Sequence, residues 1–528
     1  MAAPTPSSEQ QTPLQQITQP FIDLVHAPRA LWGINLAYFL EGWVYFGMLG
    51  YLAMHFSDFV FAGTDSPDVH SHHMVMVLTA GITISMFFLG SMADKFGVRR
   101  TLLTAFVFLL AGRIIWSAAP VVYPDGGLWS GTHWMTMAGI LLVVIGYGMY
   151  QPAAYAGVRL FTSSKTAAMG YAMLYALMNL GGWLPSFFSG IRNAIGITGA
   201  FWVYTGITVV AVIATFLILT PKVTRDAITR AEKERAEEKD AADAEKTTQE
   251  IADEKTAAVT AADLASKAPI PTHLYGVLLA IAAACWFLLP DYMSLNRIFA
   301  GVFVALPALL LTAPQLLGPA YRWLAEHPLS NTKFFFFIFA LIPVQTLFTY
   351  NWLILPQYLE RAFEGGFVSE NFEFFANMNP IMIFIAVPII TALTMKKKVY
   401  SMMIIGTFVM AVPAFLLALD TSIYTLMGFL VIMTIGEAMW QPRFLQYAAE
   451  IAPEGRTGAY MGVAQFPWFL TKMLVPLYSG HMLQKYVPSE GPRDPETMWL
   501  YFALLAMCST IMLIVAKGWV GKDFKTKS

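Results

Sequence analysis

Five ionisable residues lie within long apolar stretches of the sequence, and they are the first candidates for chemistry. They are Glu41, Arg113, Glu437, Arg443 and Lys472. A charged side chain at the centre of a bilayer costs at least about 2.5–3.5 kcal/mol on insertion scales, so such residues are commonly retained for function. We therefore treat all five as candidate groups for binding a proton or a charged solute.

Glu437 and Lys472 fall about midway along two consecutive apolar stretches. If both face one cavity they could pair, and a proton or an anionic solute could then break the pair. A static buried ion pair, or a lysine whose ammonium reaches the membrane surface, fits the same sequence. Arg113 fits a structural role as well as a functional one, and Arg443 could instead hold the cytoplasmic end closed.

The octet that contains Glu437 occurs twice in the chain. Residues 145–152 read IGYGMYQP and residues 435–442 read IGEAMWQP. The shared Gly, Met, aromatic, Gln and Pro predict matched kinks and amides in two related halves. The second copy has Glu437 where the first has Tyr147, so the repeat predicts an acid on one side only.

The composition places these residues in a membrane protein. Hydrophobic residues make up 57% of the chain and charged residues only 13%, against about 25% charged residues in soluble domains. Runs of about 20 apolar residues, enough to span a bilayer, occur fourteen times. We therefore predict an all-α, polytopic protein of about 14 transmembrane helices in a lipid bilayer. The net charge of −1 gives no reason to expect a nucleic-acid partner.

The spacing of the two octets predicts how these helices are grouped. Removing residues 221–332 leaves about 178 residues between the copies, a length that fits six spanning helices with their loops. Each octet then falls in the fourth helix of a six-helix half, and solute sites at the interface of such halves are typical of transporters. The predicted organisation is a flexible cytoplasmic tail (1–28), a six-helix bundle (29–220), a charged cytoplasmic linker (221–271), two additional transmembrane helices (272–320), a second six-helix bundle (321–518) and a cytoplasmic tail (519–528).

Basic loops predict the orientation. The segments DKFGVRR, MKKKVYS and KGWVGKDFKTKS fall on one side of the membrane, which the positive-inside rule makes cytoplasmic. We therefore expect both termini in the cytoplasm and the protein in the cell membrane. The charged linker, rich in Ala, Glu, Lys and Asp, has no sustained apolar stripe, which favours a mobile helical connector over a coiled coil.

Neutral polar and aromatic residues within the spans are candidates for lining a solute cavity. Amides and hydroxyls near proline kinks can bond a solute or freed backbone carbonyls. Bonding between neighbouring helices is the alternative for any one of them. The candidates are Tyr45, Tyr150, Gln151, Asn179, Gln345, Asn379, Trp440 and Gln441.

The loop GSMADKFGVRR, residues 90–100, resembles the signature loop of the major facilitator superfamily. Gly90 and Gly97 would allow a tight turn and close helix approach. Asp94 could bond a neighbouring helix end and Arg159, and so latch one conformation. Alternatively, the basic residues of the loop, Lys95, Arg99 and Arg100, act only as topology signals.

Further motifs resemble those of the proton-dependent oligopeptide transporters. They are EGWVYFGM (41–48), GYGMYQP (146–152), LYALMNLGG (174–182), NPIMIFIAVP (379–388) and Gly436–Glu437. The resemblance covers residues from about 30 to 515 and implies the major facilitator fold, with two extra helices between the halves. It also implies alternating access and proton symport.

The departures from that family concern charge. Its first helix carries two acids and an arginine, but Tyr38 and Gly42 replace the first acid and the arginine, which leaves Glu41. Its fourth-helix lysine is Gln151, and Leu49 stands where it has a further arginine. The cationic set that receives a peptide carboxylate is therefore largely missing, so the chain resembles a divergent relative.

We accordingly expect a secondary transporter of a small polar solute, driven by protons and acting as a monomer. Di- or tripeptide-like compounds, nucleosides and organic acids remain open as solutes, and a receptor or scaffold that has lost transport is the alternative. The sequence contains no phosphate-binding Gly-x-x-x-x-Gly-Lys-Ser/Thr loop and suggests no catalytic set, metal or cofactor. The run HSHH at 70–73 is expected to be a polar turn in a solvent loop rather than a metal site.

Overall fold

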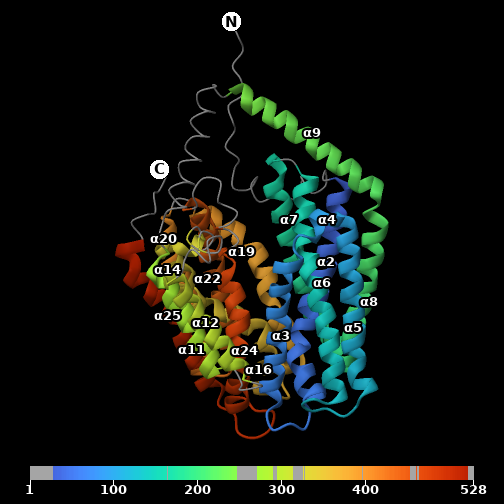
Figure 1. Cartoon of the computed structure of the whole chain (residues 1–528). Helices are drawn as coiled ribbons and strands as arrows, with labels where there is room; N and C mark the ends of the chain where they lie inside the picture. Colours follow the sequence, from blue (N-terminus) through green and yellow to red (C-terminus); the bar gives the residue numbers. More distant parts are fainter. Residues whose placement is uncertain are drawn as a thin grey trace.

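The computed structural model describes residues 28–162, 164–245, 270–288, 294–312, 321, 325, 327–394, 397–451, 460 and 463–520. The predicted tails before residue 28 and after residue 520, and linker residues 246–269, lie outside the described residues. The described part confirms an all-α fold of two six-helix halves with additional helices between them (Figure 1).

The first half contains six long helices and three short ones. Gly97 has a φ of 82°, a backbone conformation that favours glycine, and it separates two of them in the predicted tight turn. The elements are α2 (Arg29–His55), η1 (Phe56–Val60), α3 (Pro67–Leu89), α4 (Met92–Phe96), α5 (Val98–Val122), α6 (Gly131–Phe161), α7 (Ser164–Trp183), η2 (Leu184–Phe187) and α8 (Ser189–Ile218).

The second half repeats this plan with more interruptions. Two of its spans are broken next to Pro343 and Pro413, because proline lacks the N–H that would continue the helix. Its elements are η4 (Pro328–Ser330), α14 (Thr332–Ala340), α15 (Ile342–Leu353), α16 (Leu355–Ala362), α17 (Phe367–Glu370), α18 (Phe372–Ala376), α19 (Met378–Thr394), α20 (Val399–Ala411), α21 (Ala414–Leu419), α22 (Ile423–Glu450), α24 (Phe466–Tyr486) and α25 (Pro495–Val520).

Three helices of the described residues lie between the halves in the chain. The helix α9 (Pro221–Glu245) lies against α6 and α2 of the first half, and buries Ala227 and Ala231. This part of the predicted linker is therefore a helix that lies against the first half, where small alanines let it approach closely. The helices α11 (Thr272–Leu288) and α12 (Leu295–Thr312) pack on each other.

Seven described helices are long and apolar enough to cross a membrane, by length and composition. The helices α2, α3 and α24 are not among them, and these three supply polar residues to the cavity described below. The seven are Val98–Val122, Gly131–Phe161, Ser189–Ile218, Thr332–Leu353, Val399–Leu419, Ile423–Leu445 and Pro495–Val520.

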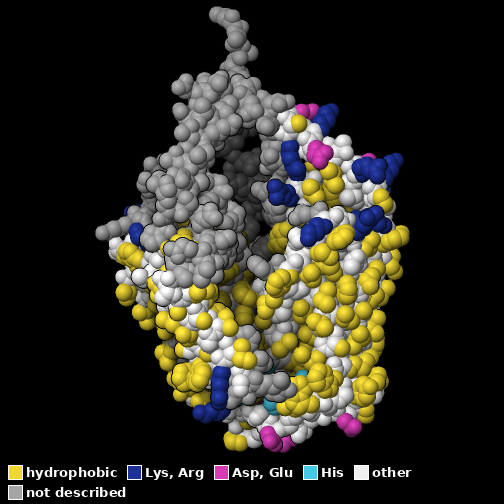
Figure 2. All heavy atoms as spheres, viewed as in Figure 1, with side chains coloured by type: hydrophobic (Ala, Val, Ile, Leu, Met, Phe, Trp, Pro, Cys, Tyr) yellow, Lys and Arg dark blue, Asp and Glu magenta, His cyan; other side chains and the backbone are white. Residues whose placement is uncertain are grey.

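The two ends of the bundle differ. We call the end that carries α9 the α9 end, and the opposite end, with η1 and α16, the η1 end (Figure 1). In the view of Figure 2, Lys and Arg side chains gather around the α9 end of the first half with a few Asp and Glu among them, and fewer charged side chains of either sign appear toward the η1 end.

Candidate functional site

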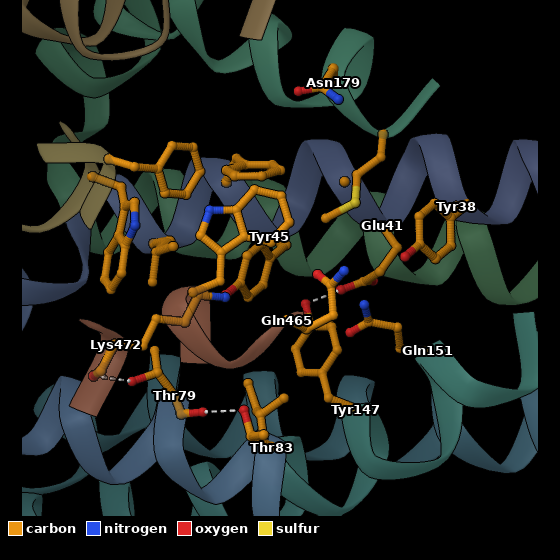
Figure 3. A pocket seen from close by; sticks show the side chains of 18 of the residues that line it. Tyr38, Glu41, Tyr45, Thr79, Thr83, Tyr147, Gln151, Asn179, Gln465 and Lys472 are labelled. Carbon is orange, nitrogen blue, oxygen red and sulfur yellow. Dashed lines mark hydrogen bonds between the residues drawn. The ribbon is translucent and has the colours of Figure 1, made fainter. Parts of the chain in front are cut away.

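A cavity of about 220 Å³ lies between the two halves. The first half supplies residues from α2, α3, α6 and α7, and the second half from α15, α19, α22 and α24. Eight predicted residues line it, and Figure 3 labels five of them. The eight are Glu41, Tyr45, Tyr150, Gln151, Asn179, Asn379, Glu437 and Lys472.

Glu41 forms a buried ion pair with Arg113 of α5. Both side chains are 2% exposed, and the guanidinium reaches both carboxylate oxygens, one of them at 2.9 Å. Arg113 also donates to Thr208 at 2.7 Å and to the Tyr147 hydroxyl at 2.9 Å, and that hydroxyl donates to Glu41. Glu41 is therefore charge-compensated by a helix other than its own.

The two octets occupy equivalent places, and their glycines serve the same purpose. A Cβ at Gly146 would lie 2.8 Å from Leu109 of α5, and one at Gly436 would lie 2.2 Å from the Met410 nitrogen of α20. Each glycine therefore lets the fourth helix of its half approach the third closely. Tyr147 and its counterpart Glu437 both line the cavity.

Glu437 and Lys472 line the same cavity from neighbouring helices of the second half. The Glu437 side chain, 2% exposed, accepts a hydrogen bond of 2.8 Å from the Asn379 amide. No ion pair joins Glu437 to Lys472 in the part of the chain that the structure describes. In Figure 3 the Lys472 side chain extends toward the Tyr45 ring.

Five predicted residues, including Arg113, are not among the described residues that line the cavity. The Trp440 indole donates to the Met410 sulfur at 3.1 Å, so it packs between α22 and α20. Gln345 is 2% exposed, and Arg443 is 7% exposed and donates to Thr394 at 3.2 Å. Gln441, two residues before Arg443, is half-buried outside the lining. Trp440, Gln441 and Arg443 belong to α22 and Gln345 belongs to α15, so the rotation of these two helices decides which of their side chains face the cavity.

Sequence reasoning missed aromatic and hydroxyl residues of the cavity wall. Tyr38 stacks on Tyr150 with ring centroids 5.6 Å apart. Tyr38 precedes Glu41 by three residues on α2, and Tyr45 follows Glu41 by four, so the three share a helix face; this spacing was the available signal. The missed residues include Tyr38, Thr79, Thr83, Tyr155, Phe348, Trp352, Gln465 and Trp468.

The signature loop lies at the α9 end. Arg99 donates to the Leu219 carbonyl at 2.5 Å, and Arg100 is exposed. Gly90 lies beside Pro152, whose Cβ is 3.7 Å from the position of an added Cβ. The Asp94 side chain lies outside the described residues, so its latch to Arg159 stays a prediction.

A network of ion pairs joins the halves at the η1 end. Arg361 of α16 holds both carboxylate oxygens of Asp68 in α3, at 2.7 and 2.8 Å, and both side chains are below 10% exposed. Arg192 of α8 pairs with Glu373 of α18, which also accepts from Tyr51 at 2.9 Å. We call these five residues the η1-end network.

The HSHH run lies at this end, and the prediction that it forms a polar turn in a solvent loop is wrong. Residues 70–73 lie in the first turns of α3, which begins at Pro67. His72 is fully buried, and its ring nitrogens bond Ser479 at 2.6 Å and Gln357 at 2.9 Å. The run reads as polar, but the contact with α24 and α16 buries it. The described residues contain no metal-binding group of three or more His, Cys, Asp or Glu.

Glu360, next to Arg361, is a titratable group at this end. Burial, and then the Asp58 carboxylate of η1, raise the pKa of Glu360 to about 7. Arg361, Arg192 and Glu373 also act on it, the two arginines in the opposite direction. The charge of Glu360 therefore changes near neutral pH.

Comparisons with known proteins agree with this architecture. The family model described as Major Facilitator Superfamily matches residues 31–476, whereas no curated protein matches the chain. Among solved structures, the POT family transporter PepTSo is similar with a TM-score of 0.64 at 14% identity, over 94% of this chain and 99% of that one. The peptide transporter POT in complex with sulfate gives 0.60 at 18% identity, over 94% and 95%.

A third similar structure is a POT family transporter in complex with 5-aminolevulinic acid. Its TM-score is 0.59 at 17% identity, over 94% of this chain and 97% of that one. At such identities, the likeness to these three structures establishes the fold.

Proposed function

Because this chain belongs to the major facilitator superfamily, we propose that it is a proton-coupled transporter that moves a small organic solute by alternating access. The observation that supports the proposal is the cavity between the halves, whose wall carries two buried carboxyl groups. Glu41 is compensated by Arg113, whereas the Glu437 carboxylate is bonded by the Asn379 amide. Burying a charge is costly unless it is paired, so Glu437 is the group proposed to carry the proton.

The η1-end network supports alternating access. The hydrogen bonds described between the halves gather at the η1 end and reach inward as far as Thr79, which donates to the Lys472 carbonyl at 3.3 Å. Opening this end requires the halves to part there and the Asp68–Arg361 and Arg192–Glu373 pairs to break. The basic residues around the α9 end (Figure 2) favour a cytoplasmic location for that end.

Uptake into liposomes under an imposed pH gradient tests the proposal. We expect gradient-driven uptake of at least one compound from a panel of di- and tripeptides, nucleosides and small organic acids. No proton-linked uptake of any of them would refute proton symport and favour a receptor or scaffold.

A variant tests the role of Glu437. Glu437→Gln should abolish gradient-driven uptake and spare solute exchange, because the amide keeps the shape but cannot carry the proton. Glu364→Gln is the matched control, since its carboxylate is exposed and pairs with Arg493 away from the cavity. Equal gradient-driven uptake in Glu437→Gln and the unmodified protein would remove Glu437 from this role.

A further inference from the structure

We propose that the solute is an organic carboxylate with an aromatic or apolar body, and that Lys472 binds its carboxylate. The inference rests on the transport function proposed above and names the solute class of the same cavity. It follows from three properties of the wall: its charges, its unused hydrogen-bond donors and its apolar surface.

The charges of the wall leave one cation for the solute. Glu41 is neutralised by Arg113, and Glu437, which the neutral Asn379 amide bonds, is uncharged when it carries the proton of the proposed function. The Lys472 ammonium has neither an ion pair nor a hydrogen bond with any residue that the structure describes. An ammonium in a partly desolvated cavity favours an anion.

The unused polar groups of the wall point to the same ligand chemistry. Within the described part of the chain, the Trp468 indole nitrogen and the Tyr150 hydroxyl are buried without a hydrogen-bond partner. Both residues line the cavity, both side chains can donate, and indole can only donate. The two carboxylates of the wall, in contrast, already accept bonds. A ligand rich in acceptors satisfies such a wall, because unpaired buried donors are costly.

The surface around Lys472 is aromatic. Phe348 and Trp352 of α15, Trp468 of α24 and Tyr45 of α2 line the cavity with it. Phe348 and Trp468 pack with ring centroids 5.7 Å apart. Such a wall gains affinity from burying an apolar body of the solute.

Equilibrium binding to the purified full chain in detergent at pH 7.5 tests the inference, with tryptophan fluorescence as the signal. The probes are 3-phenylpropionate, its neutral amide, 3-phenylpropylamine and acetate. We expect the acid to bind at least tenfold more tightly than the amide or the amine. Acetate, which lacks the apolar body, should bind at least tenfold more weakly than 3-phenylpropionate.

Variants of two lysines on the same helix assign the effect. Lys472→Gln should weaken acid binding at least tenfold and leave amide binding unchanged, and Lys472→Arg should retain part of the preference for the acid. Lys485→Gln is the control, because Lys485 is exposed at the η1 end of α24 and lies 5.0 Å from the Tyr486 ring. It should bind like the unmodified protein.

Two outcomes overturn the inference. In the first, the unmodified protein binds the amide or the amine as tightly as the acid, or does not bind the acid. This measurement does not depend on any variant. The other is a Lys472→Gln variant that keeps the preference for the acid. Acid binding that depends on Lys472 but occurs without gradient-driven uptake would instead refute proton symport. Proton-driven uptake of neutral solutes alone would refute only the claim that the solute is a carboxylate.

Discussion

Replacing Arg113 by leucine is expected to destabilise the first half, because it leaves the Glu41 carboxylate buried without its cation. Both side chains are 2% exposed. Removing one partner of a buried pair costs about 3–5 kcal/mol. For a unit of 150–250 residues, 1 kcal/mol shifts the melting temperature by about 2–4 °C, so we expect a fall on the order of 10 °C.

The assay is thermal unfolding of the purified protein in detergent, followed by tryptophan fluorescence. The double variant Glu41→Leu with Arg113→Leu should recover most of the loss, because removing both charges of a buried pair is often neutral or stabilising. Arg100→Leu, on the same helix but exposed, is the control and should melt within about 2 °C of the unmodified protein.

The reasoning is refuted in either of two ways. Arg113→Leu could melt within about 2 °C of the unmodified protein, which would mean that Glu41 does not depend on its arginine for compensation. Alternatively, the double variant could melt as low as the single variant. The loss would then come from the packing of the arginine rather than from an uncompensated carboxylate.

Three further predictions concern helix packing and the η1 end. Gly436→Ala should lower stability by about 1–3 kcal/mol, because its Cβ would lie 2.2 Å from a backbone nitrogen of α20. Gly206→Ala is the control and should not lower stability, since no atom lies within 4 Å of its added Cβ. Thermal unfolding compares the two variants. Arg361→Ala should leave Asp68 unpaired and raise hydrogen exchange in α16 at least tenfold, and unchanged exchange would contradict a closing role. Glu360 has a pKa of about 7, so it favours closure of the η1 end when protonated and opposes closure when ionised. Hydrogen exchange in α16, corrected for its intrinsic pH dependence, should therefore rise from pH 5 to 8. Glu360→Gln should flatten that rise.

The sequence predicted the fold because the fold depends on patterns that are local. Apolar runs long enough for a bilayer identified the spans, and the two octets placed them in two halves. The glycines of the octets also indicated helix packing, since Gly146 and Gly436 each lie against the third helix of their half. The burial of the HSHH run was not predicted, because it depends on contacts with helices that are about 280–400 residues away in the chain.

Three of the five predicted ionisable residues line the candidate cavity, and its neutral residues were also predicted only in part. A charged residue in an apolar run is conspicuous, and Glu41, Glu437 and Lys472 all line the cavity. Trp440 and Gln345 can also form hydrogen bonds, as the neutral cavity residues can, but neither residue lines the cavity. A single-residue rotation moves a side chain by about 100° around a helix, and sequence alone does not fix it across broken spans such as α14–α15.

By itself, the sequence determined the membrane class, the two halves, their repeated fourth helix and the asymmetric acid. These follow from composition and spacing along one chain. Only the tertiary structure decided which charges are already satisfied. It gave Glu41 an arginine from α5 and Glu437 an amide from α19, and it left Lys472 without a partner among the described residues. The physical reason is that charge compensation depends on distances between helices, which their order in the sequence does not specify.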